Sequence, residues 1–491
     1  MLHRYSLNNP KIELKSDLSA HNPLYIYLCP NRDYLLYTDS INELLEHKEV
    51  TKPLAVREES ISFLLQSGIV PLPYTIYQDI FSVGIGDIAT VRTINSKITI
   101  DFSHNFPFKD SYRDESMDID ENKIIELLAT ATTSKLNCSN PTYLFHSAGK
   151  DSNMIALALA EAGVQKEITC LTHKSKGEQD ESEISKNIAT KLGFKHQKLY
   201  LPKKLQSKEL NSIENYFENA PFPSVDNVTL AYPIYATQVN FDMSNIIDGS
   251  GNDVYMGHIP TQVEFTKQRL FSKLHHFRVF TDYLDSANKL RNITLTRVEW
   301  AGINGFSFGD SKKIFKPTTN NYEYWREMSK QRDKWDYLEV RADIWGSFVE
   351  SDRVIRKSRN LASIYHANLI LPWCNQEVAT YFSKLPSKVL YNKKELKNKL
   401  ILRKILKDKI GLDSDKLGKM AFSFDFFSIL MMMRSEVVRE IIECKLWNRE
   451  EIEYKVLSLI KYSNRYSKNR VLLQRLYLIS AWYNKSRYIK K

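Results

Sequence analysis

A short loop between an apolar run and a helical pattern carries residue types that suit phosphate binding. Residues 143–145 are apolar and aromatic, and apolar residues recur at helical spacing from Met154 onward, which predicts a strand, a tight loop and a helix. Backbone N–H groups at the positive end of such a helix bind phosphate oxygens. Asp151 could both cap the helix and hold a magnesium ion that carries a polyphosphate. The loop consists of Ser147, Ala148, Gly149, Lys150, Asp151 and Ser152.

A second turn of the same kind follows about a hundred residues later. Residues 246–258 form another apolar run that opens into a glycine-rich turn with a carboxylate, Asp253, inside it. The first loop alone could be an ordinary strand-to-helix turn with a Ser or Asp cap. Two strand ends that each deliver an aspartate beside small residues would instead allow Asp151 and Asp253 to share one cation. The small residues of the second turn are Gly249, Ser250 and Gly251.

Both loops resemble those of the asparagine synthetase-like ATP pyrophosphatases, which include asparagine synthetase B, the β-lactam synthetases and the lasso-peptide macrolactam synthetases. The nucleotide loop of this family runs S-G-G-x-D-S, and residues 147–152 match it with Ala148 for the first glycine. The second loop runs G-x-G-x-D-E, and residues 249–254 match it up to Val254, which replaces the glutamate. The resemblance implies that these loops bind the cofactors ATP and Mg²⁺, with Asp151 and Asp253 as metal ligands.

The resemblance also implies an α/β fold like that of the adenine-nucleotide α-hydrolases, with helices on both faces of a parallel sheet and a helical C-terminal part. Strand patterns at 167–172 and 196–200 flank a helical pattern at 178–192, which agrees with a parallel sheet. Such sheets bind ligands at the carboxyl ends of their strands. The family packs the end of the second strand on the adenine, which would place Leu171 and Thr172 near the base. Plain strand residues are the alternative interpretation.

The N-terminal part differs from the rest. Residues 1–115 alternate short apolar runs with turns, which predicts a small, mostly β domain with a helix or two. Residues 60–91 resemble the end of the glutaminase domain of asparagine synthetases. Glutamine-using members carry a nucleophilic cysteine after the initiator methionine, whereas this chain has Leu2. We therefore expect a degenerate glutaminase-like domain over residues 1–115 that yields no ammonia from glutamine, and an ATP-pyrophosphatase domain over residues 116–491.

Three basic residues in the C-terminal part match catalytic positions of the family. Lys399 and Arg403 match the motif K-x-x-L-R on a helix, and Lys419 matches the lysine of a K-x-G-F turn. The reaction develops negative charge on the leaving pyrophosphate and on the acyl-adenylate under attack, so basic groups would stabilise it. Without the resemblance, Lys399 and Arg403 would be solvated helix charges, and Lys419 an exposed loop lysine.

The composition is that of an ordinary globular protein, and no apolar run approaches the roughly 20 residues that cross a bilayer. Five cysteines without CxxC spacing argue against a zinc site or a disulfide framework and indicate a reducing cytoplasm. The net charge of +11 comes largely from residues 454–491, which hold ten Lys or Arg and no acidic residue. This favours a solvated basic helical tail, or a surface that meets a polyanion or an acidic partner, over a nucleic-acid channel.

The resemblance implies a two-step ligase reaction. A carboxylate attacks the α-phosphorus of ATP to give an acyl-adenylate and pyrophosphate, and ammonia or an amine then displaces AMP to form an amide. Macrolactam formation on a peptide or natural product, or amidation of a sugar acid, is favoured. An ammonia-using asparagine synthase is less favoured, because Leu2 and Ser250 stand where asparagine synthetases have cysteine and glutamate. A non-catalytic protein that binds a nucleotide or a partner is the alternative class.

The base that deprotonates the amine is not identified by the resemblance. Asparagine synthetases carry a glutamate and β-lactam synthetases a tyrosine between the glycines of the second loop, with a glutamate in a later E-x-R segment. Here Ser250 and Asn368 occupy those positions, and neither is a strong base near neutral pH. The base lies elsewhere, or the nucleophile needs none, or the second half-reaction is lost. The candidates for a base elsewhere are Tyr255, His258, Tyr365 and His366.

Overall fold

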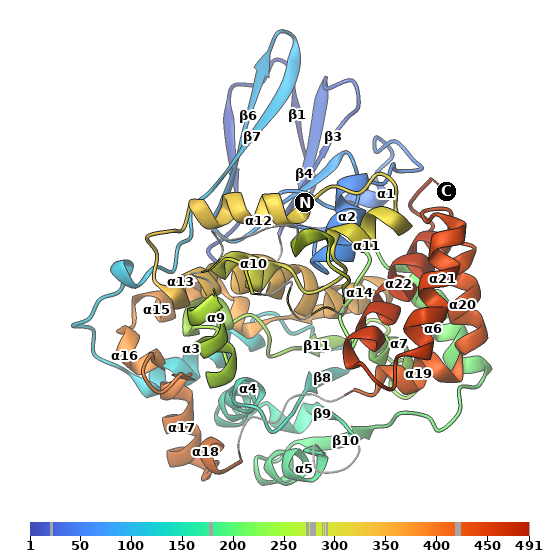
Figure 1. Cartoon of the computed structure of the whole chain (residues 1–491). Helices are drawn as coiled ribbons and strands as arrows, with labels where there is room; N and C mark the ends of the chain where they lie inside the picture. The colour runs from blue at the N-terminus through green and yellow to red at the C-terminus, as the bar shows by residue number, and fades with distance from the viewer. Residues whose placement is uncertain are drawn as a thin grey trace.

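A five-stranded parallel sheet lies at the centre of the molecule (Figure 1). Its strand order is β10-β9-β8-β11-β12, and every neighbouring pair runs in parallel. The strands are β8 (Thr142–Phe145), β9 (Ile168–His173), β10 (Lys195–Leu199), β11 (Asn245–Ile247) and β12 (Asn368–Ile370). The structure is a computed structural model that describes residues 1–19, 23–175, 180–271, 274, 281–286, 288, 290, 293–417 and 424–490.

Helices cover both faces of this sheet. Successive side chains of each strand point to opposite faces, so each strand contributes residues to both cores. Leu144 and Ile247 belong to one core, and Leu171 and Ile246 to the other. The first face is covered by α3 (Glu121–Thr133), α4 (Lys150–Glu161), α5 (Ser182–Lys191), α15 (Gln376–Lys384) and α17 (Leu400–Ile410). The second is covered by α6 (Ser207–Asn219), α7 (Ala231–Tyr235) and α14 (Arg356–Ile364). The predicted fold class is confirmed.

The N-terminal region is built from two antiparallel sheets, as the sequence predicts. Their orders are β1-β4-β3-β5 and β2-β6-β7. The elements are β1 (His3–Ser6), β2 (Ile12–Lys15), β3 (Leu24–Leu28), β4 (Tyr34–Thr38), α1 (Ile41–Glu46), α2 (Glu58–Gln66), β5 (Ile80–Val83), β6 (Asp87–Ile94) and β7 (Lys97–His104). This region also meets the end of the chain, since the N–H of Leu54 donates to the Tyr488 carbonyl at 3.0 Å. A domain boundary at residue 115 therefore stays a prediction.

The segment between β11 and β12 is helical and includes a long π-helix, η7 (Ala342–Val354), just before α14. The other elements are α8 (Asp253–Met256), α9 (Gln262–Phe271), η5 (Thr281–Tyr283), α10 (Arg297–Gly302), α11 (Phe308–Ile314), α12 (Asn321–Lys330) and α13 (Tyr337–Arg341). A Cβ atom on Gly346 would lie 2.4 Å from Cβ of Val254, so only glycine allows η7 to approach α8 so closely. This contact holds η7 against the helix that begins with Asp253. Stretches of π-helix are frequent at functional sites.

The basic C-terminal segment is helical, and most of its described basic side chains are at least partly exposed, but its helices pack into the molecule rather than extend from it. The end of the chain forms α19 (Phe426–Met432), α20 (Arg434–Ile442), α21 (Arg449–Lys461) and α22 (Ser467–Lys485). Most of α22 is buried, and the buried Arg475 donates to the Leu65 carbonyl at 3.0 Å. The apolar side chains of α22 pack against α20 and α21, which lie beside it in Figure 1.

Short elements complete the fold. They are η1 (Asp110–Tyr112), η2 (Gln165–Glu167), η8 (Pro372–Cys374), α16 (Ser387–Leu390), β13 (Tyr391–Asn392), β14 (Lys397–Asn398) and α18 (Ser414–Leu417). No helix within the described ranges combines the length and the apolar character needed to cross a membrane.

Candidate active site

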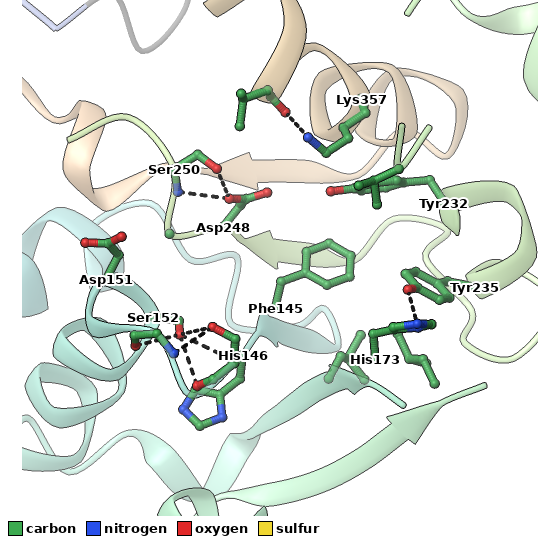
Figure 2. A pocket seen from close by; sticks show the side chains of 17 residues that line it. Phe145, His146, Asp151, Ser152, His173, Tyr232, Tyr235, Asp248, Ser250 and Lys357 are labelled. Carbon is green, nitrogen blue, oxygen red and sulfur yellow. Dashed lines mark hydrogen bonds between the residues drawn. The ribbon is translucent and has the colours of Figure 1, made fainter. Parts of the chain in front are cut away.

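A cavity of about 290 Å³ opens at the carboxyl ends of β8, β9 and β11. Figure 2 shows Asp151 and Ser152 at one end of this cavity, His173 and Tyr235 at the other, and Phe145 between them. One end is therefore polar and the other largely aromatic. This is the arrangement expected of a site that holds a polyphosphate at one end and a flat base at the other.

The predicted phosphate loop forms the polar end. Gly149 caps α4, and the N–H of Gly149 donates to Oγ of Ser147 at 3.0 Å. Oγ of Ser152 accepts from the N–H of Ser147 at 3.2 Å, which closes the loop on itself. Four of the six predicted loop residues line the cavity, namely Ser147, Gly149, Asp151 and Ser152. The start of α4 thus turns its positive end toward the cavity.

The second loop packs directly on the first. A Cβ atom on Gly249 would lie 3.2 Å from the backbone nitrogen of Ser152, so a larger residue would push the two loops apart. Gly251 has a φ of +110°, and a Cβ atom there would lie 2.1 Å from Sγ of Cys374. Oγ of Ser250 donates to Asp248 at 2.7 Å. The glycines that the sequence singled out are therefore required by close approach and by backbone conformation.

The two predicted metal-binding carboxylates converge on one ammonium group. Nζ of Lys399 lies 2.7 Å from Oδ2 of Asp151 and 2.9 Å from Oδ1 of Asp253. Asn252 fixes the first carboxylate by donating to Oδ1 of Asp151 at 2.6 Å. Burial alone would lower the pKa of the Lys399 ammonium, but the charges of Asp151 and Asp253 raise it above its ordinary value. The two acidic side chains thus lie together at the phosphate end, as predicted from the sequence.

These features agree with the comparison with known proteins. Residues 123–454, more than half of the chain, match the family described as asparagine synthase. The chain belongs to the asparagine synthase family. A Methanocaldococcus jannaschii protein named "Putative asparagine synthetase (glutamine-hydrolyzing) 2" is 20% identical over 257 residues, which are 52% of this chain and 48% of that protein. The chain thus matches about half the length of this curated relative.

The other predicted catalytic residues of this asparagine synthase family protein lie apart from the Asp151–Asp253 pair or outside the described ranges. The guanidinium of Arg403 pairs with Asp415, and its Nε donates to the Asn398 carbonyl at 2.9 Å. Arg403 therefore supports the turn before α17 rather than facing the carboxylates. Lys419 lies outside the described residues, which omit 418–423. Its predicted role stays a prediction.

At the aromatic end, only one of the two predicted adenine contacts lines the cavity. Leu171 does, together with Leu199, Val228 and Tyr232. Oγ1 of Thr172 instead donates to the His146 carbonyl at 2.8 Å and contacts Ser185 at 2.6 Å. Neighbouring residues of a strand point to opposite faces, so Leu171 and Thr172 could not both reach one ligand.

Glu350 is a candidate functional residue that the sequence did not reveal. It lies in η7, and one of its oxygens accepts from the N–H of Gly251 in the second loop at 2.7 Å. Its other oxygen is buried and has no hydrogen-bond partner among the described residues. Burial, and then the charge of Asp253, raise the pKa of Glu350 to about 8. Nothing in the local sequence marks this glutamate, because almost a hundred residues separate it from the loop that it contacts.

Two further polar residues were also missed, one bonded to the phosphate loop and one lining the cavity. Glu181, just before α5, accepts from the N–H of Ala148 in the phosphate loop at 2.9 Å. Lys357 lines the cavity from α14, donates to the Val354 carbonyl at 2.8 Å and lies 3.4 Å from Asp226 (Figure 2). A basic or acidic residue in an amphipathic helix gives no sequence signal that distinguishes it from a solvated charge.

Of the four residues considered as alternative bases, Tyr255 and His258 are engaged in other contacts, and Tyr365 and His366 lie away from the second loop. The hydroxyl of Tyr255 donates to the Trp373 carbonyl at 2.7 Å, deep in the core. The ring of His258 stacks on Trp345 with centroids 4.4 Å apart. Tyr365 and His366 precede β12, and β12 begins at the end of the sheet opposite the cavity. Their geometry does not favour any of them as a base acting at the second loop.

Proposed function

We propose that the protein is an ATP-dependent amide-forming ligase that activates a carboxylate as an acyl-adenylate and transfers it to ammonia or an amine. The observation that carries the proposal is the convergence of Asp151 and Asp253 on Lys399 beside the phosphate loop. An ordinary capped turn requires neither the second carboxylate nor the buried lysine. An acidic pair beside backbone N–H groups suits a triphosphate with its metal ion.

The two carboxylates fit magnesium by their chemistry. Mg²⁺ prefers oxygen ligands and is commonly held by one or two carboxylates together with substrate phosphates. Among the described residues there is no group of three or more His, Cys, Asp or Glu that could hold a metal by itself. Asp151 and Asp253 would therefore bind the ion together with phosphate oxygens. When bound, the ion would neutralise charge that develops on the pyrophosphate.

The protein's own residues supply binding and orientation. Backbone N–H groups at the start of α4 hold the phosphates, and Leu171 with the neighbouring aromatic residues encloses the base. A substrate carboxylate oxygen attacks the α-phosphorus, the bond to the bridging oxygen breaks, and pyrophosphate leaves. Lys399 and Lys419 are proposed to stabilise the charge on pyrophosphate and on the adenylate. The amine nitrogen then attacks the acyl carbon, AMP leaves, and the amine loses a proton to a base.

The acyl substrate is proposed to be a peptide or natural-product carboxylate that forms a macrolactam, or a sugar acid that becomes an amide. An ammonia-using asparagine synthase is an alternative within the same chemistry. We place the reaction in the cytoplasm and do not expect glutamine to supply the ammonia, because Leu2 stands at the position of the glutaminase nucleophile. The division into a degenerate glutaminase-like domain (1–115) and a catalytic domain (116–491) is part of this proposal.

An ATP–pyrophosphate exchange assay with a panel of carboxylic acids tests the first half-reaction. We expect exchange that depends on one class of acid and is lost in Asp151→Asn and Asp253→Asn. The exposed Asp242 is a matched control, and Asp242→Asn should exchange like the wild type. ATP binding without exchange for any acid would instead support a non-catalytic nucleotide-binding protein, a second candidate that Ser250 and Asn368 favour because neither is a strong base.

A further inference from the structure

The two carboxylates assigned to magnesium already hold a cation that belongs to the chain. Nζ of Lys399 lies within 2.9 Å of both Asp151 and Asp253. The Lys399 side chain is 8% exposed, whereas each carboxylate side chain is 30% exposed. The ammonium therefore occupies the inner side of the pair, and the carboxylates remain open to a ligand. A metal ion bound to the same oxygens would be repelled by an ammonium at this distance.

The backbone around Lys399 is held in a conformation that directs the side chain at the acidic pair. Lys399 has φ 57° and ψ 39°, a left-handed conformation that is unfavourable for any residue with a Cβ. The preceding Asn398 is anchored by its side chain to the Gly257 carbonyl at 2.8 Å and by its own carbonyl to Arg403. Strained backbone of this kind persists where surrounding contacts impose it. The Lys399 side chain, with four rotatable bonds, is then the part that can move.

The charges leave the pair ready for a divalent ion. One ammonium neutralises only one of the two aspartates, so the pair keeps a net negative charge. A divalent cation would neutralise both aspartates. It would also release Lys399, and the released ammonium needs an anion nearby, which phosphate oxygens at the start of α4 can provide.

We propose that Lys399 is a resident counter-ion that holds Asp151 and Asp253 together in the nucleotide-free protein and moves to phosphate oxygens when the metal arrives with a polyphosphate. The polyphosphate part rests on the proposed function, whereas the competition between ammonium and metal does not. Free metal ions bind weakly, because they must displace Lys399 without giving it a new partner. Metal and polyphosphate together bind well, so each increases the affinity for the other.

Binding of Mn²⁺, measured as loss of the free-ion EPR signal without nucleotide, tests the competition. Lys399→Met keeps the length of the side chain and removes the charge, and we expect it to bind Mn²⁺ about tenfold more tightly than the wild type, a coupling of ordinary size. Lys404→Met removes an exposed lysine from the same helix and should leave Mn²⁺ binding unchanged. Equal or weaker Mn²⁺ binding by Lys399→Met than by the wild type would overturn the proposal.

Two further measurements keep the test decisive. Inorganic pyrophosphate should increase Mn²⁺ affinity several-fold in the wild type and much less in Lys399→Met, because only the wild type has an ammonium to transfer. If Lys399→Met folds poorly, Lys399→Gln is used, and Mn²⁺ should raise its melting temperature more than that of the wild type. An equal Mn²⁺ effect on both melting temperatures would contradict the exchange. If the wild type shows no ATP–pyrophosphate exchange but Lys399→Met binds Mn²⁺ more tightly than the wild type, the ligase proposal is overturned. The counter-ion role of Lys399 then remains.

Discussion

The phosphate end of the cavity and the position expected to activate the amine differ in how closely they follow the family pattern. At the phosphate end, both aspartates, the glycines and the buried Lys399 are present and in contact. At the amine position, Ser250 bonds to Asp248, and Asn368 lies at the opposite end of β12, where its side chain donates to the Lys135 carbonyl at 2.6 Å. The residues that we propose for adenylation are in contact, whereas Ser250 and Asn368, at the two positions that carry the base in the family pattern, are not strong bases. Adenylation and amide formation can therefore be tested separately.

The largest expected effect is on adenylation. Asp151→Asn removes one of the two charges that hold Lys399 and the proposed metal, so we expect ATP–pyrophosphate exchange to fall by about 10³-fold, the upper range for loss of one electrostatic contact. The circular dichroism spectrum should remain that of the wild type. A variant that folds and exchanges within a few-fold of the wild type would remove the proposed role of the acidic pair.

Glu350 provides the second test, because it is bonded to the second loop and has one oxygen without a partner among the described residues. If this oxygen receives the amine proton, Glu350→Gln keeps the hydrogen bond from Gly251 and should slow amide formation about 10²-fold while exchange changes little. Product formation is measured at saturating amine, beside exchange. The exposed Glu323 supplies the control substitution Glu323→Gln. Equal losses in both half-reactions would assign Glu350 to the structure of the loop.

A smaller effect is expected from the contact between the two loops. Gly249→Ala places a Cβ atom 3.2 Å from the Ser152 nitrogen, so the loops must separate by a few tenths of an ångström. We expect exchange to fall about tenfold through a misplaced phosphate site, with little change in stability. The matched control is Gly163→Ala, where no atom lies within 4 Å of the new Cβ, although its φ of +77° makes a modest stability loss the expected result.

The smallest effect on activity concerns His104, which joins the N-terminal sheet to η7. Its ring nitrogens contact Asp87 at 2.7 Å and Asp343 at 2.9 Å. Burial alone would lower the pKa of His104, but these carboxylates raise it from 6.5 to about 9. The raised pKa means that the folded state stabilises the protonated ring of His104. This contribution to the free energy of unfolding is fully present below pH 6.5 and is lost as the pH rises through about 9.

His104→Gln tests this contact through stability. We expect the variant to be less stable than the wild type by on the order of 2 kcal/mol at pH 6, and the difference to shrink by pH 10. Urea unfolding at the two pH values measures it. A difference that does not depend on pH would show that the ring contributes packing alone. Exchange activity at pH 7 should remain close to that of the wild type.

The sequence alone determined the local parts of the site. The phosphate loop, the second loop and the alternating strands and helices were predictable, because each depends on turn residues and hydrophobic periodicity within about 20 residues. Lys399 was predictable only through a family motif. The glycines could be named from the sequence, but the reason that Gly251 must be glycine is its φ of +110° and the nearby Sγ of Cys374.

Tertiary structure alone decided which groups meet. Glu350 and Glu181 bond to the two loops and Lys357 lines the cavity, although all three are distant from the loops in sequence and their own neighbours give no sign of these contacts. Thr172 and Arg403 were assigned to the site but face other partners, because strand alternation and helix rotation fix where a side chain points. The ammonium between the two aspartates is likewise a result of folding, since a buried charge persists only where the fold brings opposite charges to it.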